Sequence, residues 1–68
     1  MMDTIAKIIE LLTEKGITEP EFYKAIGVDK STFSRWKSKE CSISVKNIVK
    51  SADFLGVTAD YLMGNINS

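Results

Sequence analysis

The sequence contains no histidine, so it lacks the side chain that most often acts as a general acid or base in enzymes. No serine or cysteine can be paired with an imidazole, and the four glycines lie far apart rather than in a phosphate-binding loop. We therefore predict no catalytic residues and no enzymatic activity.

Cysteine and long apolar runs are equally scarce. The single cysteine, Cys41, excludes an internal disulfide and fits a reducing compartment, and no His/Cys cluster offers a metal site. No apolar run approaches the roughly 20 residues of a membrane span, and the N-terminus lacks a signal-peptide pattern. We expect one cytoplasmic domain over residues 1–68, with no cofactor, no metal and no membrane association.

The net charge of zero conceals an uneven distribution. Residues 1–23 hold two lysines against five carboxylates, a balance of −3, and residues 51–68 add two carboxylates. Residues 24–50 hold seven basic against two acidic side chains, a balance of +5. A basic middle segment can present a positive face to phosphates, although charge alone leaves a solvated lysine face equally open.

Apolar spacing and capping residues predict an all-α fold of five helices. Stripes at helical spacing are formed by Ile5, Ile8, Ile9 and Leu12 and again by Val45, Ile48, Val49 and Ala52. Thr18 and Glu21 form a capping-box pattern, and Asp29 is a suitable N-cap. The expected helices cover about residues 3–15, 19–26, 30–38, 45–54 and 59–63.

A turn of only three residues, 27–29, separates the second and third expected helices, which is the outline of a helix-turn-helix motif. Phe33 and Trp36 give the third helix an inward edge. Its outward side carries small hydroxyls around one arginine, which suits a DNA major groove because arginine can bind guanine bidentately. A solvated surface helix is the alternative, but such a helix would favour Glu and Ala, and residues 30–39 contain neither.

Two strings, GVDKSTFSRW at residues 27–36 and ADFLGVTADYL at residues 52–62, resemble the Cro/CI-type (XRE) helix-turn-helix repressors of phages and bacteria. The resemblance extends over residues 5 to 64. It implies a compact five-helix bundle, the lambda-repressor-like DNA-binding domain, that binds DNA as a two-fold dimer.

The resemblance also implies which residues meet DNA. Base-contacting positions of the family fall on Lys30, Ser31, Thr32 and Arg35. Periodicity favours Ser31 and Arg35 independently and ranks Thr32 lower, as a residue on the flank. Expected phosphate-contacting residues are Ser34, Lys37, Ser38, Lys39 and Lys46.

The sequence departs from the family pattern at four places. Glu19 replaces a glutamine that binds phosphate, and we expect its charge to repel DNA and restrain affinity. Tyr23 replaces an alanine and must either pack differently or displace the helix slightly. Leu12 and Lys37 replace an Arg–Glu pair, which should leave Lys37 free for DNA. Lys39 and Ile43 replace a glycine and a proline, so the backbone of this loop is not determined by the sequence.

These observations predict a sequence-specific regulator of transcription, a repressor, acting on double-stranded DNA. The alternative is a protein-interaction module of the antitoxin or antirepressor kind that reuses the fold, which Glu19 and the zero net charge keep open. Tyr61, Met63 and Ile66 near the C-terminus are candidates for a weak homodimer contact that strengthens on a palindromic operator. These side chains could instead simply fold back over the first helix.

Overall fold

The structure is a computed structural model that describes residues 3–64, and all of its regular elements are helices. Their order in the chain is α1 (Thr4–Lys15), α2 (Glu19–Ala25), α3 (Lys30–Ser38), α4 (Val45–Leu55) and α5 (Ala59–Met63). The all-α prediction is therefore confirmed. Three limits differ by one residue from the expected ranges. Asp3 caps α1 from outside it, α2 ends at Ala25 with Ile26 as its C-cap, and α4 continues to Leu55.

Side-chain caps define where the helices begin. The predicted capping box is present at α2, where the Glu21 N–H donates to Thr18 Oγ1 (3.3 Å) and the Thr18 N–H donates to Glu21 Oε1 (2.8 Å). Hydrogen bonds from the Thr18 N–H and the Thr18 hydroxyl to the carboxylate hold the pKa of Glu21 below its usual value. Ser44 and Thr58 cap α4 and α5 with their side-chain oxygens, each of which accepts a hydrogen bond from an otherwise unpaired backbone N–H.

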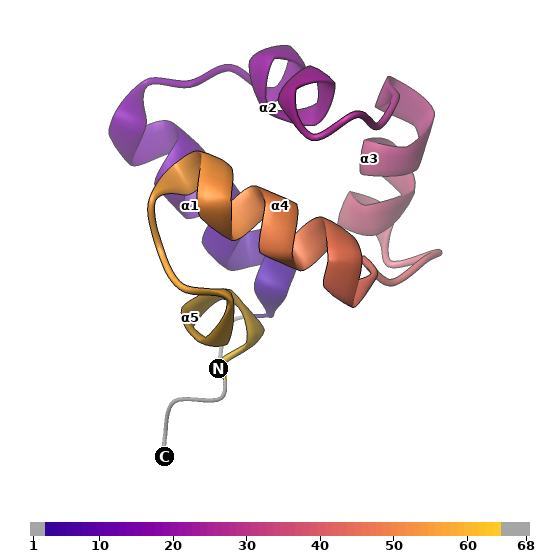
Figure 1. The fold of residues 1–68 in the computed structure, drawn as a ribbon. Helices are drawn as coiled ribbons and strands as arrows, with labels where there is room; N and C mark the ends of the chain where they lie inside the picture. Colours follow the sequence, from indigo (N-terminus) through magenta and orange to yellow (C-terminus); the bar gives the residue numbers. More distant parts are fainter. Residues whose placement is uncertain (1–2, 65–68) are drawn as a thin grey trace.

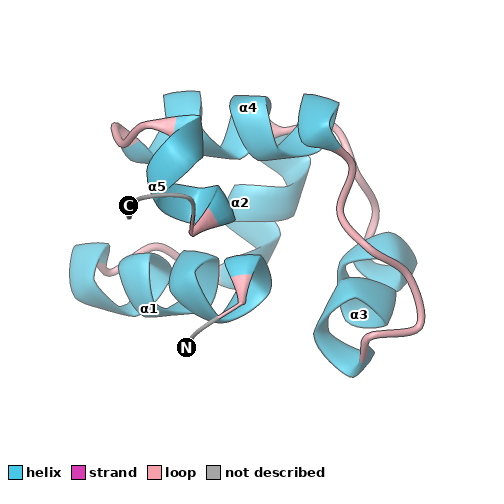
Figure 2. Ribbon diagram, turned by 90° about the horizontal axis from the view of Figure 1, so that it is seen from below, coloured by secondary structure: helices cyan, strands magenta, loops and turns pink. Residues whose placement is uncertain are grey.

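The five helices enclose one core. In Figure 1, α4 crosses in front of α1, α2 lies above both, and α3 stands at one side. Figure 2 shows α3 set apart from the other helices and joined to α4 by the longest loop of the described chain. The short α5 lies at the other end of the molecule and packs on α1 and α4. This arrangement leaves one long side of α3 open.

Aromatic rings connect the helices of the turn motif to α4. Phe22 of α2 is fully buried, with its ring centroid 5.6 Å from that of Phe33 and 6.1 Å from that of Phe54. Trp36 meets Phe33 edge to face at 6.2 Å. Tyr23, which occupies the family's alanine position, is half-buried with its ring 5.8 Å from Phe33. Its bulk is therefore accommodated at the edge of this aromatic cluster.

The prediction of which side of α4 is buried is wrong, because the helix is rotated about its axis relative to the expected orientation. Val45 and Val49 are 63% and 51% exposed, whereas Ser51 is completely buried. The buried side is formed by Ile48, Ser51, Ala52 and Leu55, which have the same helical spacing as the predicted set. Ser51 can be buried because its hydroxyl donates to the Asn47 carbonyl oxygen at 2.7 Å. Periodicity counted only apolar residues and so overlooked it.

Smaller differences of the same kind occur in the first two helices. On α1, Leu11 is buried in the core, whereas Ile9, which the sequence placed on the buried stripe, is only half-buried against it. On α2, Ala25 is exposed, although Phe22 and Ile26 are buried as expected. The predicted inward edge of α3, Phe33 and Trp36, is confirmed, with both residues at most 4% exposed.

The orientation of α4 can be checked by a pair of substitutions. Ser51→Leu places extra volume in a fully buried site and should lower the free energy of unfolding by about 1–3 kcal/mol. Val49→Ser on the exposed side of the same helix should change it by no more than about 0.5 kcal/mol. Urea denaturation measures both, and a larger effect at Val49 than at Ser51 would contradict the observed rotation of α4.

Candidate nucleic-acid interface

The open side of α3 carries the residues expected to contact bases. Lys30, Ser31 and Arg35 are all exposed, while Phe33 and Trp36 on the opposite side are buried. Thr32 is only half-buried and lies between the two sides, as its lower rank from periodicity predicted. The hydrophobic packing of one side of α3 thus determines which polar side chains are presented to the solvent.

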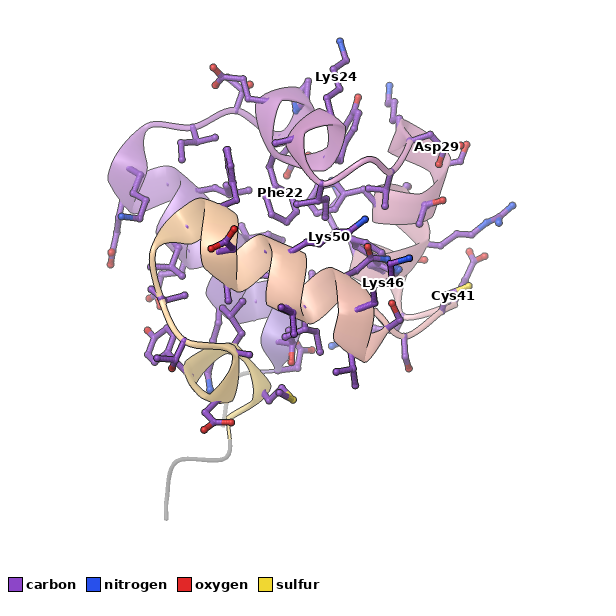
Figure 3. The ribbon with its side chains drawn as sticks, in the orientation of Figure 1. Phe22, Lys24, Asp29, Cys41, Lys46 and Lys50 are labelled. Atoms are coloured by element: carbon purple, nitrogen blue, oxygen red, sulfur yellow. The ribbon has the colours of Figure 1, made fainter. Side chains whose placement is uncertain are left out.

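The N-terminus of α3 is fixed by Asp29, which Figure 3 shows at the start of the helix. The Thr32 N–H donates to Asp29 Oδ1 at 2.8 Å. Hydrogen bonds from the Thr32 side chain and backbone hold the pKa of Asp29 below its usual value. The carboxylate is therefore charged at neutral pH and holds the first turn, which carries Lys30 and Ser31, in a defined position.

The C-terminal end of α3 has a left-handed cap made by a lysine. Lys39 has φ 68°, and among residues 3–64 every other positive φ belongs to a glycine. The Glu40 N–H donates to the Arg35 carbonyl oxygen at 3.0 Å, which closes the helix. The glycine of the family pattern is thus absent, but its backbone conformation is retained. Ser38 is exposed, and its hydroxyl donates to the Arg35 carbonyl oxygen at 3.2 Å.

Lys37 and Lys39 each lie in an ion pair with a carboxylate from the acidic N-terminal segment. Lys37 Nζ is 2.9 Å from Glu19 Oε1, and Lys39 pairs with Asp3. The expectation that Lys37 is free is therefore wrong. The ion pair forms because Lys37 lies on the side of α3 that packs on α2. There its ammonium also lies 5.2 Å from the centroid of the Phe33 ring.

The exposed Lys46 lies near the first turn of α4, in the basic segment of the chain. Figure 3 labels Lys46 and Lys50 on this helix, and both residues are exposed. Lys50 was not among the predicted site residues. Its signal in the sequence is the four-residue spacing from Lys46, which places two cations on one side of a helix. The serine Ser34 is exposed on α3, between the base-contacting candidates.

Two of the three predicted dimer residues lie in the described structure. Tyr61 is 39% exposed, its ring lies 5.5 Å from Lys7 Nζ, and its carbonyl oxygen accepts a hydrogen bond from that ammonium (3.1 Å). Met63 is half-buried against the core, next to the fully buried Leu62. Ile66 lies outside the described residues. Part of this end therefore packs on α1, as the alternative interpretation expected.

Within residues 3–64, no group of three His, Cys, Asp or Glu side chains could hold a metal ion. None of the helices there is long and apolar enough to cross a membrane. Cys41 is exposed in the loop that follows α3.

Comparison with known proteins agrees with this geometry. Residues 8–62 match the profile of the helix-turn-helix family. Over 60 residues the chain is 37% identical to an uncharacterized HTH-type transcriptional regulator of Haemophilus influenzae. The match covers 88% of this chain but only a quarter of that relative's length, and no solved structure matches significantly. The chain belongs to the Cro/CI-type (XRE) helix-turn-helix family, whose motif is a DNA-binding element of transcription regulators.

Proposed function

We propose that this chain is the DNA-binding domain of a cytoplasmic transcriptional repressor that recognises a specific double-stranded sequence through α3. The observation that carries the proposal is the polarity of α3, whose buried aromatic edge holds it on α2 while its exposed side offers hydroxyls and cations. A helix presented in this way fits the major groove, where base edges carry a distinct pattern of donors and acceptors.

Four residues of α3 would read bases. Lys30 and Ser31 occupy the N-terminal turn, which points at base edges in this motif. Arg35 lies one turn further along the same exposed side and can bind guanine O6 and N7 together. Thr32 reaches the groove only from the flank, since its side chain is half-buried.

Phosphate contacts would surround these residues. Ser34 and Ser38 are exposed on α3, and the exposed Lys46 and Lys50 lie one turn apart on α4. Lys37 and Lys39 are also close to this surface, but each must leave its carboxylate partner before it can bind a phosphate. The contribution of these two lysines should therefore be smaller than their charge suggests.

The proposal predicts salt-dependent binding to duplex DNA of any sequence. Affinity for a mixed-sequence duplex should fall steeply with salt, and Lys46→Ala should reduce the slope of log affinity against log salt by about 0.9 for each lost phosphate contact. Lys15→Ala, at the exposed end of α1, is the control of equal charge. Binding without salt dependence would overturn the proposal and favour the protein-interaction alternative.

Arg35 should determine sequence preference. Arg35→Ala should weaken binding to the selected operator by about 1–3 kcal/mol and relax the preference at one base pair of each half-site. Selection of bound sequences from fragmented genomic DNA identifies the operator, and titration of operator and mixed duplex then compares both proteins. An equal loss on both duplexes would show that Arg35 contacts only phosphate.

The oligomeric state is a further part of the proposal. Tyr61 and Met63 at the α5 end are only partly covered, and together with Ile66 they would form a small two-fold contact. A small apolar contact gives a weak dimer in solution, which DNA strengthens by holding two copies side by side. Two recognition helices about 34 Å apart would then require a palindromic operator.

Sedimentation at several protein concentrations, with and without operator, tests this assembly. We expect mainly monomer in free solution and two chains on one operator. Tyr61→Ala should reduce the cooperativity of operator binding more than the affinity for a single half-site. A stoichiometry of one chain per complete operator would contradict the dimer.

A further inference from the structure

The residues of two family departures, Glu19 and Lys37, lie against each other in the fold. Their side chains, eighteen positions apart in the sequence, meet at 2.9 Å between Lys37 Nζ and Glu19 Oε1. The Lys37 side chain is 38% and the Glu19 side chain 43% exposed, so solvent reaches both. The ring of the buried Phe33 lies beneath the ammonium, 5.2 Å from its nitrogen. The two side chains therefore carry opposite charges that neutralise each other at this point of the surface.

The position of Lys37 on α3 separates it from Arg35, the main candidate for base recognition. At about 100° per residue, Lys37 and Arg35 project roughly 160° apart around the helix. Lys37 instead follows Phe33 by four residues, which places it on the side of α3 that packs on α2. Its ammonium is thus located at the junction of the two helices of the motif, where Glu19 opens α2.

We propose that Glu19 and Lys37 form an internal brake on DNA affinity, in which the Glu19 carboxylate holds an ammonium that would otherwise bind a backbone phosphate. This inference rests on the proposed function, DNA binding. A carboxylate and a phosphate offer the ammonium the same kind of charged oxygen acceptor, so they compete for it directly. Contact with DNA requires Lys37 either to leave Glu19 or to remain with it and neutralise no phosphate.

The same pair contributes little to the fold, because exposed ion pairs are screened by water and salt. The association of α2 with α3 depends instead on the contact between Phe22 and Phe33 in the core. Removal of the Glu19 charge should therefore act on DNA binding without disturbing the helices.

A double-mutant cycle tests the brake on a mixed-sequence duplex of about two helical turns. The four proteins are the natural chain, Glu19→Gln, Lys37→Met and the double variant, each titrated over a salt series. Methionine keeps an unbranched stem over Phe33 and removes the charge. In the presence of Lys37, Glu19→Gln should tighten binding and steepen the slope of log affinity against log salt by about 0.9. The ratio of the variant's affinity to that of the natural chain should therefore fall about 3.5-fold between roughly 50 and 200 mM salt. In the Lys37→Met background, most of this gain should disappear.

Glu21→Gln is the matched control, because it removes an equal charge from the same turn of α2 and glutamine can still complete the capping box. It should not reproduce the effect of Glu19→Gln. Far-UV circular dichroism and thermal unfolding establish that every variant is folded.

Three results would overturn the brake: an unchanged affinity for Glu19→Gln, an equal gain in both Lys37 backgrounds, or an equal gain from Glu21→Gln. An equal gain in both backgrounds would mean that Glu19 repels phosphate directly. If none of the four proteins shows salt-dependent binding, the proposed function itself fails, a result distinct from these three.

Discussion

The contact between Phe22 and Phe33 is the constraint on which the site depends. These rings are the largest fully buried side chains of the protein, and they join α2 to α3 at a centroid distance of 5.6 Å. With Trp36 also buried, the rotation of α3 about its own axis is determined, because a turn of one residue would expose an indole or a phenyl ring to water. The polar side of α3 is therefore a consequence of its apolar side, and substitution of either aromatic residue would misplace Arg35 without touching it.

The sequence was sufficient to predict the helices and their ends to within one residue, since caps are local signals. Thr18 with Glu21, and Asp29, each hydrogen-bond a backbone N–H within three residues, so no tertiary contact is needed to recognise them. The sequence did not predict which side of α4 is buried. Two stripes of identical spacing overlap at Ile48 and Ala52, and the choice between them depends on whether a serine can be buried, which only the packed neighbours of α4 determine.

The ion pairs between distant residues could not be predicted from the sequence for a different reason. The joint loss of the family's Arg–Glu pair indicated a change around Lys37, but it suggested a free lysine rather than a new partner. Glu19 and Lys37 meet only because the turn at residues 27–29 reverses the chain and brings the end of α3 back to the beginning of α2. Asp3 and Lys39 are further apart in sequence, and they meet only when α1 packs against α3.

These two ion pairs reduce the positive charge that the basic segment can offer to DNA. The balance of +5 in residues 24–50 suggests a strongly basic face, yet two of its lysines are paired with carboxylates from the acidic segment before them. Both pairs flank the C-terminal end of α3, whereas the exposed Lys30 lies at its N-terminal end and the exposed Lys46 lies on α4. The cation density around α3 is thus lower at the end that faces away from base edges. Because phosphate contacts form on any sequence, the two ion pairs should lower the affinity for arbitrary DNA and for an operator alike. Discrimination between sequences then depends on the base contacts of α3, which neither carboxylate touches.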